Sequence, residues 1–114
     1  MLKYFYSKSS TKRKILDIRD DIERIVKLHC KEKFFIDWYG AYDIDPKHLV
    51  YWVCIETDNL KAKLESDKDL NSELRQLLEK YNYPIEARKF VHMGFESRET
   101  VDRESGGNWY HHFK

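Results

Sequence analysis

The sequence predicts a single α+β domain over residues 1–114, with the split β-α-β, or ferredoxin-like, arrangement. The prediction depends on short aromatic stretches that alternate in polarity, on two longer stretches with helical spacing, and on their order, β-α-β-β-α-β. This arrangement has a four-stranded antiparallel sheet with two helices on one face. A short C-terminal helical turn and a tail follow the last strand.

The first two elements lie between residues 2 and 30. The stretch LKYFY alternates in polarity and predicts a strand over Leu2–Tyr6. The hydroxyls of SKSST can cap a helix, and apolar residues then recur at helical spacing from Ile15 to Val26. We therefore expect a helix from about Thr11 to Cys30.

A hairpin is expected next. KFFIDWYGAY and LVYWVCIE are rich in aromatic and β-branched residues, and DIDPKH between them combines turn-forming Asp with a Pro. A connection this short cannot hold a parallel crossover, so the two strands should pair antiparallel.

Leucines at helical spacing follow from Thr57, and SDKD provides a second cap, which predicts a short helix and then a longer one. Pro84 ends the helical region, and ARKFVHMGFE predicts the last strand, over 87–96.

The C-terminal appendage is expected to begin with Ser97 as the cap of one helical turn over Arg98–Glu104. Gly106 and Gly107 should end that turn and leave NWYHHF extended.

Composition narrows the class of protein. Lys and Arg number 21 against 20 Asp and Glu, so a net charge of +1 provides no global attraction for nucleic acid or anionic lipid. Cys30 and Cys54 form no CxxC pair, which favours buried thiols in a reducing compartment. No stretch has the apolar core of a signal peptide or a membrane span, so we expect a soluble cytoplasmic protein.

Strand alternation assigns one set of side chains to the helix-covered face of the sheet and the other set to an open face. The open set is aromatic and acidic, and a tryptophan from the C-terminal tail can reach it. The expected binding residues are Phe35, Asp37, Tyr39, Trp52, Glu56, Phe90, His92, Glu96 and Trp109.

Contiguous exposed apolar area of this kind usually marks an interaction site. We therefore expect a non-enzymatic domain that docks a partner protein, or itself as a homodimer, and an inhibitory or immunity-type protein would have this size. In the alternative, Trp109, Tyr110 and Phe113 cover the face. The tail could then enclose a small ligand or a modest catalytic site, and the distinction is whether the rings line a cavity or fill it.

The other function classes have weaker support. Asp37, Glu56 and Glu96 would repel phosphate, and LVYWVCIE lacks the Gly and the basic residue that RNA-binding sheets carry. Adjacent His111 and His112 would point to opposite sides of an extended tail, so no metal site is expected. No nucleophile-elbow, P-loop or dinucleotide motif occurs, and no catalytic residue or cofactor is assigned.

Overall fold

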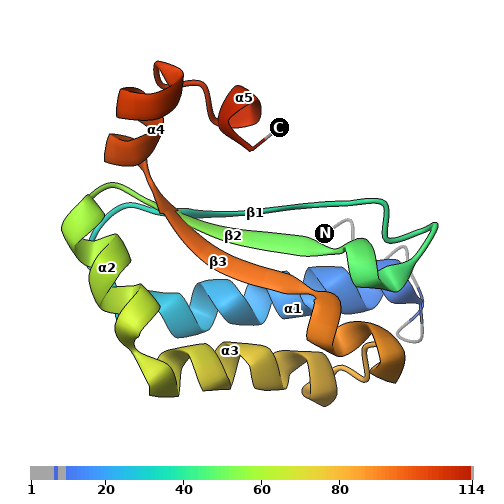
Figure 1. The fold of residues 1–114 in the computed structure, drawn as a ribbon. Helices are drawn as coiled ribbons and strands as arrows, with labels where there is room; N and C mark the ends of the chain where they lie inside the picture. Colours follow the sequence, from blue (N-terminus) through green and yellow to red (C-terminus); the bar gives the residue numbers. More distant parts are fainter. Residues whose placement is uncertain (1–6, 8–9, 114) are drawn as a thin grey trace.

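Three strands and the helices around them form an α+β fold in the computed structural model, which describes Ser7 and residues 10–113. The helical elements lie before, between and after the strands (Figure 1). In chain order the elements are α1 (Thr11–Lys27), β1 (Phe35–Tyr39), the 3₁₀ helix η2 (Pro46–His48), β2 (Val50–Ile55), α2 (Asp58–Ser66), α3 (Lys68–Lys80), the 3₁₀ helix η3 (Ile85–Phe90), β3 (His92–Ser97), α4 (Arg98–Ser105) and α5 (Trp109–His112).

The sheet has the order β1-β2-β3. β1 and β2 pair antiparallel, with Asp37 opposite Trp52, so the predicted hairpin is confirmed. β3 pairs with β2 in parallel, with Trp52 opposite Gly94. The sheet is therefore mixed, with β2 at its centre.

The predicted four-stranded antiparallel sheet is wrong. A split β-α-β arrangement requires another strand between the two strands that its second helix connects, and here those strands, β2 and β3, are hydrogen-bonded to each other. The connection over residues 56–91 holds α2, α3 and η3, which is long enough for a parallel crossover. The predicted strand Leu2–Tyr6 lies outside the described residues.

The last strand also begins later than predicted. Residues 85–90 form η3, which starts after Pro84 with a hydrogen bond from the amide of Ala87 to the carbonyl of Pro84. The Arg75 guanidinium donates to the carbonyls of Arg88 and Val91, which holds this segment against α3. The apparent alternation from residue 87 onward therefore spans a turn of 3₁₀ helix and then a strand.

The core lies between the sheet and the helices α1 and α3, which cover one sheet face (Figure 1). Isoleucines of α1, such as Ile18 and Ile22, and leucines of α3, such as Leu70, are fully buried against Tyr51 and its neighbours on the strands. The Tyr51 hydroxyl donates to the Ile15 carbonyl over 2.6 Å, and this bond ties β2 to α1.

The helix caps follow the sequence closely. Ser10 caps α1, and Asp67, inside SDKD, caps α3, so the predicted pair of helices after Thr57 is confirmed. α1 ends at Lys27 and not near Cys30, because the amides of Leu28 and His29 bond back to carbonyls of its last turn.

For the C-terminal appendage, the predicted helical turn after Ser97 is confirmed and the predicted extended tail is wrong. Ser97 caps α4, and Gly106 ends it in the left-handed conformation with φ of 59°. The segment expected to be extended instead forms α5, because the Asn108 side chain accepts from the His111 amide and starts a new turn. None of the helices in the described residues combines the length and the hydrophobicity that a membrane-spanning helix requires.

Direct parallel pairing of β2 and β3 can be tested with disulfides. Val50 and His92 are register partners, and neighbouring strands lie about 4.8 Å apart, within the usual Cα separation of a disulfide. We expect the Val50→Cys/His92→Cys variant to oxidise to a bridge, detected by peptide mass spectrometry without reduction.

The matched control is Tyr39→Cys/His92→Cys, whose residues lie in the same row but on either side of β2. This pair should stay unbridged. A bridge in the control and none in the Val50/His92 pair would contradict the strand order.

Candidate functional site

The open face of the sheet is the face directed away from α1 and α3. It carries the alternate strand residues Phe35, Asp37, Tyr39, Trp52, Cys54, His92, Gly94 and Glu96. Their strand neighbours Ile36, Tyr51 and Phe95 are buried in the core on the opposite side. The alternation in the sequence therefore assigned these positions to the correct face.

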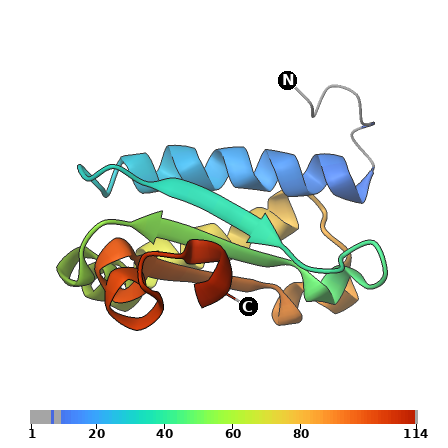
Figure 2. The same cartoon turned by 90° about the horizontal axis from the view of Figure 1, so that it is seen from above.

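The C-terminal tail, residues 106–113, folds back over this face (Figure 2). The Phe113 ring stacks on Trp52, with centroids 4.9 Å apart and planes within 12°. The Trp109 ring meets Phe35 edge to face at 5.2 Å. Phe35 nevertheless remains 43% exposed, so the tail covers the face only in part.

Trp52 lies at the centre of the open face. Its indole N–H donates to the Tyr39 hydroxyl over 2.8 Å, and its ring lies 4.6 Å from that of His92. Gly94 provides the space, because a Cβ there would lie 2.8 Å from the Trp52 ring. Trp52 is thus held in one orientation by β1, β3 and the tail.

Glu96 fixes the tail at the other side of the face. One carboxylate oxygen accepts from the Lys61 ammonium of α2 at 2.8 Å, and the other meets His112 Nε2 at 2.8 Å. Desolvation by itself would raise the pKa of Glu96, but hydrogen bonds from Lys61, His112 and the Ser97 amide outweigh it and hold the pKa below its usual value. The carboxylate therefore stays ionised and binds α2 and the tail together.

Trp109 makes the closed tail less stable than it could be. Its indole Nε1 is buried and has no hydrogen-bond partner among the described residues. Burying such a donor unpaired costs about 1–3 kcal/mol. The packed position of the tail therefore carries this cost.

Ser105, His112 and Glu96 lie in a row that has the order of a nucleophile, a base and an orienting acid. Ser105 Oγ lies 2.9 Å from His112 Nδ1, and His112 Nε2 meets Glu96. An acyl-transfer site also needs free amides for the oxyanion. The amides of Gly106 and Gly107 donate to the Val101 carbonyl, and the amide of Asn108 donates to that of Ser105. These three amides are therefore occupied, and the row is better explained as a set of hydrogen bonds that holds the tail to α4 and β3.

A second polar cluster fixes the ends of the parallel strands. The Asp58 carboxylate of α2 accepts from the hydroxyls of Ser97 and Thr100 and from Arg103 of α4. These hydrogen bonds, with that of Ser97 the largest cause, lower the pKa of Asp58 to about 2. They join the start of α2 to α4, from which the tail emerges.

The remaining predicted site residues lie around the face. Glu56 follows β2 and pairs with Arg98 at 3.0 Å. Phe90 was predicted on the last strand, but it lies on η3, where it is 55% exposed near Lys47 and Lys89. Partial burial, followed by the charge of Arg75, lowers the pKa of His92.

The structure does not bring the three C-terminal histidines together. His112 binds Glu96, whereas His92 lies against Trp52. Among the described residues, no group of three or more His, Cys, Asp or Glu side chains could hold a metal ion. Burial raises the pKa of the Cys54 thiol, as expected for an unreactive cysteine.

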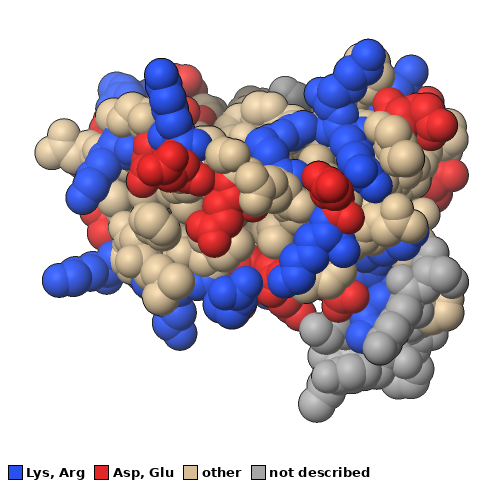
Figure 3. All heavy atoms as spheres, turned by 90° about the horizontal axis from the view of Figure 1, so that it is seen from below, with Lys and Arg blue, Asp and Glu red and all other residues tan. Residues whose placement is uncertain are grey.

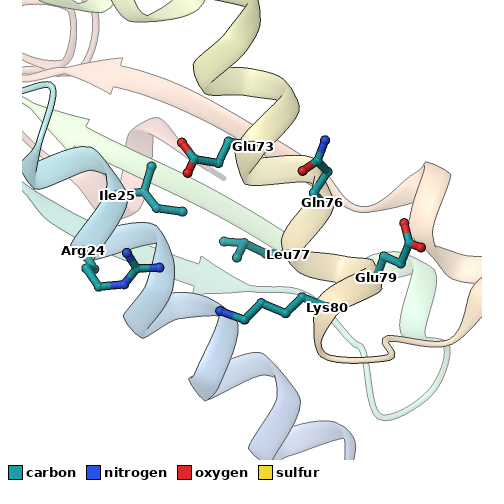
Figure 4. Close-up of a pocket in the computed structure, with 7 residues that line it drawn as sticks. All are labelled: Arg24, Ile25, Glu73, Gln76, Leu77, Glu79 and Lys80. Carbon is teal, nitrogen blue, oxygen red and sulfur yellow. The ribbon is translucent and has the colours of Figure 1, made fainter.

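The outer surface of the helices, on the opposite side of the molecule, is charged. Acidic and basic side chains are interspersed across it (Figure 3). A shallow groove between α1 and α3 has Arg24 and Lys80 along it and Ile25 and Leu77 between the helices (Figure 4). Ile25 and Leu77 belong to the core, so the groove is explained by the packing of α1 against α3.

The sequence did not predict the contacts of Lys61 and His112 with Glu96. Lys61 lies one helical turn after the Thr57 cap, but only the parallel placement of β3 brings it to Glu96. No family model, curated protein or solved structure matches this chain, so the site is interpreted from its geometry.

Gly94→Ala tests whether the central ring supports the tail. The added methyl would lie 2.8 Å from Trp52, whose ring stacks on Phe113. Overpacking of this kind costs about 1–3 kcal/mol, so the ratio of closed to open tail should fall roughly tenfold. NOE cross-peaks between the Trp52 and Phe113 rings should weaken, while those between Tyr51 and Ile15 stay. Unchanged ring NOEs would contradict this role of Gly94.

Asp58→Asn tests the polar cluster through pH. The folded pKa of about 2 lies below the ordinary 3.8. The ionised carboxylate therefore stabilises the fold above pH 3.8, and this contribution is lost as pH falls through about 2. In urea unfolding, the difference in stability between wild type and Asp58→Asn should shrink over that interval.

Asp43→Asn, an exposed carboxyl in the loop after β1, is the control for loss of one charge. Its difference from wild type should stay small throughout. If the difference in stability between wild type and Asp58→Asn does not change with pH, the Asp58 carboxylate is not the stabilising group.

Proposed function

We propose that this chain is a protein-interaction domain that docks a partner protein, or a second copy of itself, through the open face. One observation carries the proposal: each strand places a ring on this face, Phe35, Trp52 and His92, beside Asp37 and Glu96, and the tail covers the face only in part. Aromatic residues are the usual anchors of protein interfaces. A small inhibitory protein would use such a face to block its target.

The central anchor is already ordered in the free protein. The hydrogen bond between Trp52 and Tyr39 and the contact with His92 hold the indole in place. A partner that packs on Trp52 therefore loses little side-chain entropy on binding.

The charges on the face favour a basic partner. Asp37 lies beside Trp52 in the register and forms no salt bridge with any described residue. Glu56, at the end of β2, already pairs with Arg98. A cation of the partner would therefore complement Asp37, whereas phosphate groups would be repelled, so this charge supports a protein partner over a nucleic acid.

The ring contacts also weigh against an enclosed small ligand. Phe113 stacks directly on Trp52, and Trp109 lies against Phe35. The rings fill the space between tail and sheet, and a ligand site would require them to line a cavity there.

The test uses a charge reversal that leaves the ring packing intact. A photo-crosslinking residue at Asp37, or at Glu79 on α3 as control, should identify the neighbour of each face in cells that make the protein. The protein captured only from Asp37 is then purified and titrated. We expect Asp37→Lys to weaken binding roughly tenfold and Asp43→Lys to have little effect.

Self-docking is measured first, by sedimentation of the wild type across concentrations. A dimer that Asp37→Lys dissociates would identify a second copy as the partner. The proposal is wrong if neither a dimer nor a captured protein depends on Asp37 and Trp52.

A further inference from the structure

The tail occupies the open face in the way a bound peptide would. Trp109 and Phe113 are four positions apart, so one turn of helix places both rings on the same side. They contact Phe35 and Trp52, and His112, just before Phe113, contacts Glu96. Two aromatic anchors and one polar contact thus define the segment that this face accepts.

The tail joins α4 through a two-glycine turn. Gly106 and Gly107 have φ of 59° and 84°, and no neighbouring atom would contact a Cβ at Gly106. Displacement of residues 108–113 would leave the start of α4 in place, because the Ser97 cap and the Asp58 hydrogen bonds lie at the opposite end of that helix.

The closed state of the tail is weakly held. In the described part of the chain, backbone hydrogen bonds of residues 108–113 stay within 105–113 and none reaches the sheet. α5 has four residues, too few to be stable as an isolated helix. The unpaired indole N–H of Trp109 further opposes closure.

We propose that the tail is an internal mimic of the partner, and that the open face binds in trans a helical turn with the same pattern. The segment bound has two aromatic residues four positions apart, with a histidine or basic residue immediately before the second. This inference rests on the proposed function and names its partner's chemistry. The tail competes with that segment, so the free protein is held in a partly autoinhibited state.

Charge complementarity supports this occupant. Glu96 presents an ionised oxygen to His112, and a lysine or arginine at that position would form a salt bridge there. Phe35 remains 43% exposed beside the tail, so a longer segment can make contacts that the tail does not. A partner can therefore outcompete the tail.

The probe is a synthetic peptide, Ser-Gly-Gly-Asn-Trp-Tyr-His-His-Phe, which copies residues 105–113. It is titrated into the full-length wild type and into full-length Trp109→Ala/Phe113→Ala, whose own tail lacks both rings. We expect the variant to bind at least roughly tenfold more tightly than the wild type, because internal competition is removed. Adding Trp52→Ala to the variant should reverse this gain.

Two matched controls test the pattern. A peptide with the aromatic residues moved to adjacent positions should bind the variant weakly. Trp109→Phe keeps a ring but lacks the unpaired N–H, so its tail should stay closed and its peptide affinity should not exceed that of wild type.

Wild-type NMR provides a measurement that needs no variant. At saturating peptide, signals of residues 108–113 should move toward unstructured positions while the Trp52 signal stays in a ring-stacked environment. Tail signals that do not move would overturn the inference, as would peptide affinity that is independent of Trp52. A wild-type dimer formed by exchange of the tail would overturn it too, since the occupant would then be a second copy.

Failure here is separable from failure of the proposed function. If the peptide does not bind but the protein captured from Asp37 still depends on Trp52, the face docks a partner of different chemistry and the mimicry alone is wrong. If both fail, the open face is not a docking surface.

Discussion

The direct parallel pairing of β2 with β3 is the constraint on which the site depends. It places the ends of both strands at one edge of the sheet, where α2 and α4 begin and the Asp58 hydrogen bonds join them. It also brings Lys61 of α2 to Glu96 of β3. From this end of the sheet the chain turns back over the open face, where α5 lies.

The open face therefore combines a rigid base with a weakly attached cover. Trp52 is fixed by Tyr39, by His92 and by the space that Gly94 leaves. The tail is held by ring contacts and by Glu96, and it follows a two-glycine turn. Elements of low local stability are the ones that open without global unfolding, so exchange at this face is compatible with a stable core.

Local signals in the sequence predicted much of the fold. The isoleucine spacing of α1, the Asp67 cap and the Gly106 stop are set by contacts within a few residues, and they were predicted correctly. The alternation along β1 and β2 assigned Phe35 and Trp52 to the open face.

The predictions that were wrong concern features that depend on contacts between residues distant in the sequence. Strand order requires knowing that β3 adds beside β2, and the start of β3 depends on Arg75 binding carbonyls of residues 88 and 91. Phe90 was misplaced for that reason. The contact of His112 with Glu96 requires α5, which begins at the Asn108 cap. A helix of four residues is too short to show a periodic pattern in the sequence.

Fluorine NMR of the protein labelled with 5-fluorotryptophan tests the central claim, a reversible tail over a fixed aromatic face. Trp109 should show slow exchange with a minor, water-exposed state, and Trp52 should report the same rate because Phe113 leaves it when the tail lifts. Trp38, which lies against Tyr42, should report no exchange. A single, protected Trp109 state without exchange would contradict the account, since the face would then be permanently closed.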